Sequence, residues 1–235
     1  MKKIICICLA VCLLAGLFAC DWSKDEPTAA VPTTAEAATT EFIPGSIRLM
    51  EARRIHESLP EFTFTLIGDP DEEDSAFVQA IVVIAQGFYQ KLDVLESVSL
   101  DYWGDNGPVF ADFNNDGYLD MQLIKYWNYM NSTPSIFWLW DNDARQFARN
   151  EQLEELSEES IISVEDDGRV RGYSRPANDD NSTSYYSYMD GAFVLVESKH
   201  VTREFDDDDN AYWIEEISKL VDGEMQVVST TRTRW

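Results

Sequence analysis

The sequence predicts a mainly β protein, an antiparallel meander of hairpins in a propeller-like, barrel or sandwich arrangement, with one or two short helices. Asp-Gly pairs separate apolar or aromatic runs at Asp167-Gly168, Asp190-Gly191 and Asp222-Gly223, and this pattern is the strongest short-range signal for a hairpin. Hydrophobic residues make up 45% of the 235-residue chain and aromatic residues 12%, too many for a disordered acidic chain. No fixed period is evident, so a true repeat protein is not predicted.

The first elements of the globular region are predicted from their apolar patterns. Residues 46–59 place basic residues between widely spaced apolar ones, which favours a short helix ending before Pro60. Residues 62–67 alternate between apolar and polar and predict a strand, closed by the Gly-Asp-Pro cluster at 68–70. Residues 76–85 are rich in β-branched side chains and predict a largely buried strand, although the pattern also fits a helix.

The C-terminal half predicts successive hairpins joined by polar turns. Four pairs of strands are expected: 135–140 with the segment at Phe147, 161–164 with 169–173, 184–189 with 192–196, and 212–220 with 225–230. A short helical pattern at residues 150–156 interrupts this series. The half is therefore expected to be nearly all antiparallel sheet.

The N-terminus has the pattern of an export signal. Lys2 and Lys3 precede an uninterrupted apolar run over residues 4–19, which is shorter than the roughly 20 residues of a membrane-spanning helix. The run ends at Cys20, and residues 17–20 (LFAC) resemble a bacterial lipobox, whose cysteine is lipidated, although a residue smaller than Phe is usual before the alanine. An ordinary signal peptide or a short anchor helix is the alternative.

Three segments follow from this pattern. Residues 1–19 are predicted to be a lipoprotein signal peptide, residues 20–41 the lipidated Cys20 and a flexible linker rich in Thr, Ala and Pro, and residues 42–235 a β domain. The other cysteines, Cys6, Cys8 and Cys12, all precede Cys20, so the mature protein would have no disulfide. The expected location is the periplasmic or extracellular face of a bacterial membrane.

The charge of the chain excludes one class of partner. The sequence has 43 Asp and Glu against 18 Lys and Arg, a net charge of -25. A nucleic-acid interface is excluded, because binding phosphates needs a basic surface, and a polybasic contact with anionic lipid is disfavoured for the same reason. An acidic exported protein would instead attract a basic protein by electrostatic steering.

One segment has a spacing with specific chemistry. Residues 112–120 (DFNNDGYLD) follow the pattern D-x-N-x-D-G-x-x-D. Side chains at positions 1, 3 and 5 of a tightly curled loop converge on one point, and a glycine at position 6 permits the chain reversal. Calcium takes six to eight oxygen ligands at about 2.3–2.6 Å. The pattern therefore predicts a calcium site formed by Asp112, Asn114, Asp116, the carbonyl of Tyr118, and Asp120.

The loop differs from that of a helix-loop-helix calcium hand. Leu123 stands at position 12, where that motif has a bidentate Glu, and the flanks at 108–111 and 121–126 predict strands. The loop is expected to resemble those between strands of β-propeller repeat families. An ordinary acidic turn is the alternative, which the match at all five pattern positions disfavours.

The order of the predicted elements also resembles a known family. The strand at 62–67, the loop at 112–120 with its following strand, the segment SIFWLWDNDARQF at 135–147, the helix at 151–156 and the hairpin at 185–196 resemble a family of bacterial periplasmic calcium-binding β-rich proteins. Its loop has the same D-x-N-x-D-G-x-x-D pattern, and a characterised member inhibits lysozyme-like peptidoglycan hydrolases as immunity against a secreted effector. The resemblance implies a calcium-bound β fold and carries over only the calcium ligands.

Weaker features are expected to have structural roles. The run DDDD at 206–209 lacks a glycine and regular spacing, so a solvated loop is favoured over a second cation site. His56 and His200 have no Cys or His at metal-ligand spacing and are expected on the surface. Core or cross-strand packing is favoured over a sugar-stacking platform for six aromatic residues: Tyr126, Trp127, Tyr129, Phe137, Trp138 and Trp140.

Two functions remain. The first is a non-enzymatic, lipid-anchored envelope protein with a structural calcium, which binds a basic lysozyme-like peptidoglycan hydrolase and inhibits it or gives immunity to it. The alternative is a surface lipoprotein that binds carbohydrate or hydrolyses a glycoside with a carboxylate pair. No catalytic residue is predicted, because among 43 acidic residues some pair always has a suitable separation.

Overall fold

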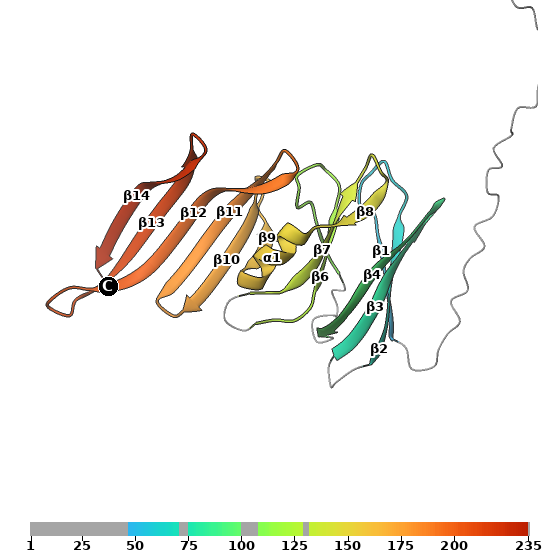
Figure 1. The fold of residues 1–235 in the computed structure, drawn as a ribbon, viewed down its shortest axis with the longest axis horizontal. Coiled ribbons are helices and arrows are strands. Elements are labelled where there is room, and N and C mark those ends of the chain that lie inside the picture. Colours follow the sequence, from blue (N-terminus) through green and yellow to red (C-terminus); the bar gives the residue numbers. More distant parts are fainter. Residues whose placement is uncertain (1–46, 71–74, 100–107, 129–131, 235) are drawn as a thin grey trace, which may run out of the picture. The chain divides into compact units, whose positions relative to one another are not determined.

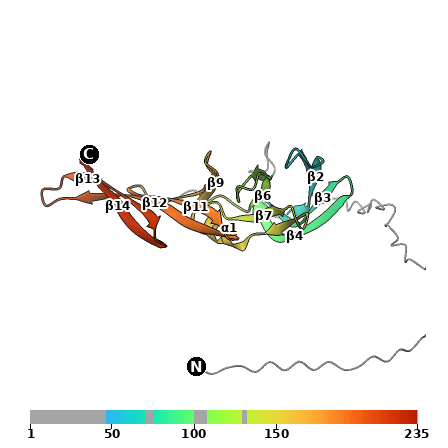
Figure 2. The same cartoon turned by 90° about the horizontal axis from the view of Figure 1, so that it is seen from above.

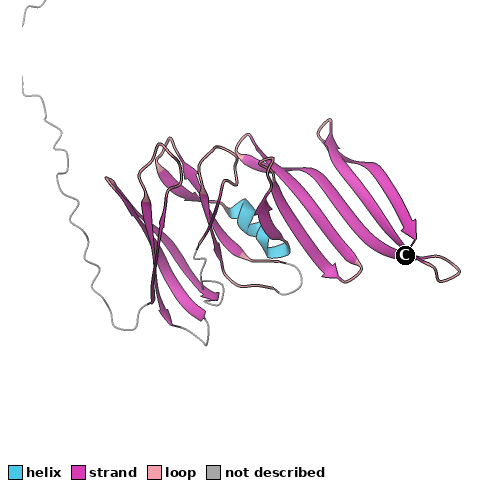
Figure 3. Ribbon diagram, turned by 180° about the vertical axis from the view of Figure 1, so that it is seen from behind, coloured by secondary structure: helices cyan, strands magenta, loops and turns pink. Residues whose placement is uncertain are grey.

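The computed structural model describes residues 47–70, 75–99, 108–128 and 132–234. The predicted signal peptide and linker, and Tyr129, lie outside these residues. The described chain is mainly β, as predicted, with three open antiparallel sheets and one short helix (Figures 1 and 3). No helix of the described residues is both long and apolar enough to cross a membrane.

The first sheet has four strands in sequence order: β1 (Ile47–Arg53), β2 (Phe62–Pro70), β3 (Ser75–Ala85) and β4 (Phe88–Ser99). The strand predicted at 76–85 is confirmed, and β4 was not predicted. The helix predicted at 46–59 is wrong, because β1 pairs with β2 along its length, from Ile47 opposite Gly68 to Arg53 opposite Phe62. Met50 is 67% exposed, so the apolar spacing that favoured a helix did not mark a buried helical face.

The cluster at 68–70 does not end β2. The strand continues to Pro70, which pairs with Ala76, and the register shifts between Ile67 and Gly68. A Cβ at Gly68 would lie 2.6 Å from the carbonyl oxygen of Phe77, so the glycine permits the close approach of β3 at this irregularity.

The second sheet contains β5 (Val109–Ala111), β6 (Asp120–Ile124), β7 (Ser135–Asp141) and β8 (Gln146–Arg149), again in sequence order. The predicted flanking strands and the 135–147 hairpin are confirmed. Residues 135–140 of β7 are all buried. Trp138 and Trp140 pack in the cluster shared with the first sheet, and Phe137 and Leu139 pack in a second cluster with residues of the helix and the third sheet.

The aromatic residues divide between core and surface. Phe137, Trp138 and Trp140 are buried, which confirms core packing for these three, whereas Tyr126 and Trp127 are exposed. Trp140 makes edge contacts with Phe62 and Phe147 at centroid distances of 5.5 and 5.1 Å. Such pairs contribute about 0.5–1.5 kcal/mol beyond burial, so this group helps to hold the first two sheets together.

Helix α1 (Glu151–Glu159) follows β8, close to the predicted position. Asn150 is its N-cap, because its Oδ1 accepts the backbone N–H of Leu153 at 2.9 Å. Leu153 and Ser157 are buried, and Ser157 Oγ accepts the backbone N–H of Ser135 in β7 at 3.0 Å.

The third sheet has six strands in the order β14-β13-β12-β11-β10-β9. Their bounds are β9 (Ile161–Val164), β10 (Val170–Ala177), β11 (Asp180–Met189), β12 (Ala192–Phe205), β13 (Ala211–Val221) and β14 (Glu224–Arg234). All three predicted hairpins are present, with several strands longer than expected.

The outer strands of this sheet form one layer (Figure 2). No described residue of β13 or β14 is buried, and Phe193 is the one buried residue of β12. Cross-strand pairs take the place of a core, such as Arg232 over the ring of Tyr212 at 3.9 Å and Lys219 with Glu197 at 3.6 Å. Each such pair contributes roughly 0.2–1 kcal/mol.

Candidate metal centre and adjoining cavity

The predicted calcium loop connects β5 to β6 and curls back on itself. Gly117 has φ +90° and Asn115 has φ +57°, so both residues adopt the left-handed conformation that a tight reversal needs. Leu123, at position 12, is buried in β6. The sheet therefore holds both ends of the loop.

The side chains at positions 1, 3 and 5 point to the inside of the loop. Asp112 accepts the backbone N–H groups of Asp116 at 3.0 Å and Gly117 at 2.8 Å. Asn114 Oδ1 also accepts from Asp116 N, at 3.2 Å, and Asp116 Oδ1 accepts from Tyr118 N at 2.9 Å. Three side-chain oxygen groups thus gather around three consecutive backbone N–H groups.

Asp120 joins the loop to the core of the second sheet. Its carboxylate is fully buried and accepts N–H bonds from Phe113 and from Trp140 in β7, both at 2.8 Å. The pKa of Asp120 is raised to about 8, chiefly by burial; the two backbone bonds oppose this rise, and the negative charges of Asp116 and Asp112 add to it. A cation in the loop would favour the ionised carboxylate and so offset the free-energy cost of burying its charge.

The donor set fits calcium in chemistry but only partly in position. All five predicted ligands offer oxygen, which suits a hard cation, and an oxygen that accepts one N–H retains a second lone pair for a metal. Among the described residues, however, no three His, Cys, Asp or Glu side chains gather closely enough to hold a metal ion.

Two neighbouring turns support the loop. The ring of Tyr118 lies against that of His56 at a centroid distance of 4.4 Å, and Leu119 N donates to the carbonyl of Ile55 at 2.9 Å. On the other side, Asn115 packs against Gly168 in the β9–β10 turn, where a Cβ would lie 2.5 Å from the Asn115 Cγ. The loop is thus in contact with residues from outside its own sheet.

A cavity of about 430 Å³ adjoins the loop. Its charged and aromatic lining residues include Asp116, Tyr118, Asp141, Asp143, Arg149 and Tyr188. Arg149 is the one cation among the lining residues, and its guanidinium is held in two bonds to Glu154, at 2.7 and 2.9 Å. The cavity therefore presents three carboxylates and suits a cationic, hydrogen-bonding group.

Most of the residues that line this cavity were not predicted from the sequence to belong to a site. Residues 141–143 were predicted only as a turn, and Arg149 and Tyr188 had no signal that links them to the loop. Only the packing of β7, β8 and β11 near the loop brings these residues to one cavity. Spacing in the sequence carries no such information.

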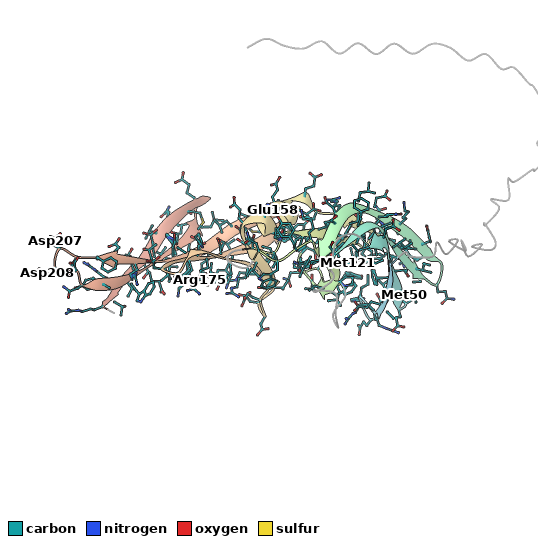
Figure 4. All side chains as sticks on the ribbon, turned by 90° about the horizontal axis from the view of Figure 1, so that it is seen from below. Met50, Met121, Glu158, Arg175, Asp207 and Asp208 are labelled. Carbon is teal, nitrogen blue, oxygen red and sulfur yellow. The ribbon has the colours of Figure 1, made fainter. Side chains whose placement is uncertain are left out.

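His200 and the acidic run at 206–209 lie in the third sheet and in one of its turns. His200 Nε2 contacts Asp180 Oδ1 at 2.8 Å in the third sheet. The run at 206–209 is the turn between β12 and β13, and Figure 4 shows Asp207 and Asp208 at its tip. Asp206 accepts N–H groups of Asn210 and Asp208, bonds that, with that of Tyr212, lower its pKa to about 2. This Asp organises the turn.

Comparisons with known proteins identify a similar fold. Neither a protein-family model nor a curated protein matches the chain. Among solved structures, a Xanthomonas type IV secretion system related protein is similar, with a TM-score of 0.56 and 16% sequence identity. The match covers 78% of this chain and 99% of that one. At this identity the similarity shows the fold alone.

Proposed function

We propose that this protein is a lipid-anchored cell-envelope protein whose calcium-stabilised β domain binds and inhibits a basic peptidoglycan hydrolase of the lysozyme type. Asp112, Asn114, Asp116, the carbonyl of Tyr118, and Asp120 would hold the calcium. The ion would have a structural role, holding the loop between β5 and β6 against the turns that it contacts.

The acidic cavity is the observation that supports this proposal most directly. Asp116, Asp141 and Asp143 line it together with Tyr118 and Tyr188. A lysine or arginine side chain of a basic partner would find carboxylate acceptors there, and the aromatic rings can pack against its apolar stem or its cation. The net charge of -25 would accelerate the encounter.

The fold similarity supports the envelope setting. The Xanthomonas protein is related to a type IV secretion system, which is consistent with a cell-envelope or secretion-associated role for this chain. A lipid on Cys20 would anchor this chain in the envelope, where a peptidoglycan hydrolase would act.

An inhibition assay tests the proposal. The full chain is added to a basic lysozyme acting on peptidoglycan, and turbidity loss is measured against inhibitor concentration. We expect saturable inhibition, weakened at least about tenfold in the Asp141→Asn/Asp143→Asn variant, because two charge-assisted contacts contribute more than about 1.4 kcal/mol.

A matched control removes the same charge from another turn. Asp207→Asn/Asp208→Asn should inhibit like the unaltered chain, because these residues lie at the tip of the β12–β13 turn. Equal weakening in both variants would mean that only net charge matters, and no inhibition by the unaltered chain would refute the hydrolase as target.

Carbohydrate binding at the same cavity is the alternative. Tyr118 and Tyr188 lie there with the carboxamides of Asn114, Asn142 and Asn150, and aromatic faces with amides also suit a sugar. Retention on insoluble peptidoglycan, lost in Tyr188→Ala, together with no effect on lysozyme, would favour this function.

A further inference from the structure

We propose that two copies of this chain pack face to face through the third sheet, on the side that α1 does not cover. Leu153 of α1 packs with Val170 of β10 and Phe193 of β12, so these side chains mark the helix side of the sheet. Successive side chains of a strand point to opposite faces. Arg171, next to Val170, therefore points to the other side, which we call the open face.

The strand register shows which residues share the open face. Arg171 lies opposite Tyr185, and Tyr185 lies opposite Glu197. Glu197 lies opposite Lys219 and contacts its ammonium group at 3.6 Å, as two residues on one face can. The same alternation along the strands places six large apolar side chains on this face: Tyr173, Tyr185, Val201, Phe205, Trp213 and Ile217.

The open face has the composition of a protein interface. None of its six large apolar side chains is fully buried by its own chain, and Phe205 is 57% exposed. Arg171 lies over the ring of Tyr173 at 5.4 Å, and Arg203 lies over that of Phe205 at 5.1 Å. Tyr, Trp, Phe and Arg are the residue types enriched at interfaces and in their hot spots. The face therefore suits contact with another protein surface.

The charge of the open face favours a second copy of this acidic chain. The charged residues among its paired strand positions are Arg171, Lys199, Arg203 and Lys219, with Glu197, Glu215 and Glu224. The face is thus nearly neutral, although the chain has a net charge of -25. At physiological ionic strength, charges more than about 8 Å away are largely screened. Two copies can therefore meet through this face, whereas a basic partner would be drawn to the acidic surfaces elsewhere.

The size of the open face fits a stable dimer. The strands β10 to β14 lie side by side and span about 24 Å at roughly 4.8 Å each. The paired residues from Glu197 to Phe205 of β12 span about 30 Å at roughly 3.3 Å each. Two such faces would bury roughly 1,400 Å² in total, within the range of about 1,200–2,000 Å² for stable interfaces. Packed about 10 Å apart, they would form a sandwich whose core the outer strands lack alone.

Sedimentation velocity of the full chain over a range of protein concentrations tests the proposal. We expect a reversible equilibrium between monomer and dimer. Ile217 lies near the middle of the open face, opposite Lys199 and Ser229. Ile217→Lys should raise the dimer dissociation constant at least about a hundredfold, because it brings an unpaired charge of each copy into the interface.

Ile214→Lys is the matched control. Ile214 is in the same strand, is half-buried like Ile217, and points to the helix side, so this change should leave the equilibrium unaltered. A chain that is monomeric at all concentrations would overturn the proposal, and that outcome includes the case in which a different protein covers the face. Equal weakening by both variants, or a dimer that Ile217→Lys leaves intact, would also overturn it.

Charge reversal at the exposed Lys219 keeps the test decisive if Ile217→Lys does not fold. Lys219→Glu makes each open face more negative by two charges, so the dimer dissociation constant should rise about tenfold. Lys91→Glu, the same change at an exposed position of β4, should leave it unaltered. Equal effects of the two variants would show that total charge controls association, and would count against the open face as the interface.

Discussion

The side-chain amide of Gln152 in α1 is hydrogen bonded to both backbone polar groups of Phe193 in β12. Gln152 Nε2 donates to the Phe193 carbonyl at 2.6 Å, and Phe193 N donates to Gln152 Oε1 at 2.8 Å. Gln90 in β4 forms the same pair of bonds with Phe147 in β8, both at 2.8 Å. Each amide takes the place of a missing neighbouring strand and links two parts of the fold.

Gln152→Ala should therefore destabilise the domain by about 1–3 kcal/mol, because it leaves the N–H and carbonyl of Phe193 without these partners. Gln152→Glu should also destabilise it, since an ionised carboxylate cannot donate to the carbonyl. Urea unfolding measures both. Gln146→Ala, at an exposed position of β8, should change stability by less than about 0.5 kcal/mol. Equal effects at 146 and 152 would contradict the bridging role.

Calcium should stabilise the fold through the loop between β5 and β6. For a dissociation constant of about 10 µM at about 1 mM calcium, binding adds about 2.7 kcal/mol to the free energy of unfolding. Chelation should lower the melting temperature, and Asp116→Ala should abolish this response. Asp143→Ala, in the same cavity but outside the loop pattern, should preserve it. A melting curve that chelation leaves unchanged would rule out structural calcium.

The calcium-free protein should lose stability as the pH rises from about 4 to about 8. Burial raises the folded-state pKa of Asp120 to about 8 from an ordinary 3.8. The folded state therefore favours the protonated acid, whose stabilising contribution is complete below about pH 4 and is lost as the pH rises through about 8. Urea unfolding at a series of pH values in this range measures how steeply the free energy of unfolding changes with pH.

Two variants of this experiment isolate Asp120. Asp120→Asn should unfold more easily, because one backbone N–H loses its acceptor, but should show a flatter slope. Saturating calcium should also flatten the slope, since the cation favours the carboxylate. A calcium-free stability that rises with pH over this range would contradict the assignment.

The contact between Asn115 and Gly168 should make Gly168 the more sensitive of two similar turn glycines. Gly168 has φ +79° and Gly191 has φ +86°, but a Cβ at Gly191 would meet nothing within 4 Å. Gly191→Ala should cost about 1–2 kcal/mol from backbone strain alone, and Gly168→Ala should cost more. Asn115→Ala should remove the excess, so a double-mutant cycle in urea measures the contact. Equal costs at 168 and 191 would show that Asn115 moves aside freely.

The hairpins were predictable because their signals are local. An Asp-Gly turn fixes a short loop, and the aromatic and β-branched runs on both sides favour strands whatever else they contact. All three Asp-Gly hairpins formed, and Asn150 capped the helix near its predicted start. At residues 46–59 the apolar spacing was only a weak signal for a helix, and residues 47–53 form a strand because they pair with β2.

The mainly β class, the turns, the short helix and the oxygen-rich loop could all be predicted from the sequence, since each depends on residues within a few positions of one another. Three relationships became visible only in the folded chain: Asp120 is buried and accepts the backbone N–H of Trp140, Asp141 and Asp143 share a cavity with the loop, and β14 is the outermost strand of its sheet. These relationships join residues far apart in the chain, and which strands meet depends on the packing of the whole domain, which no local pattern specifies.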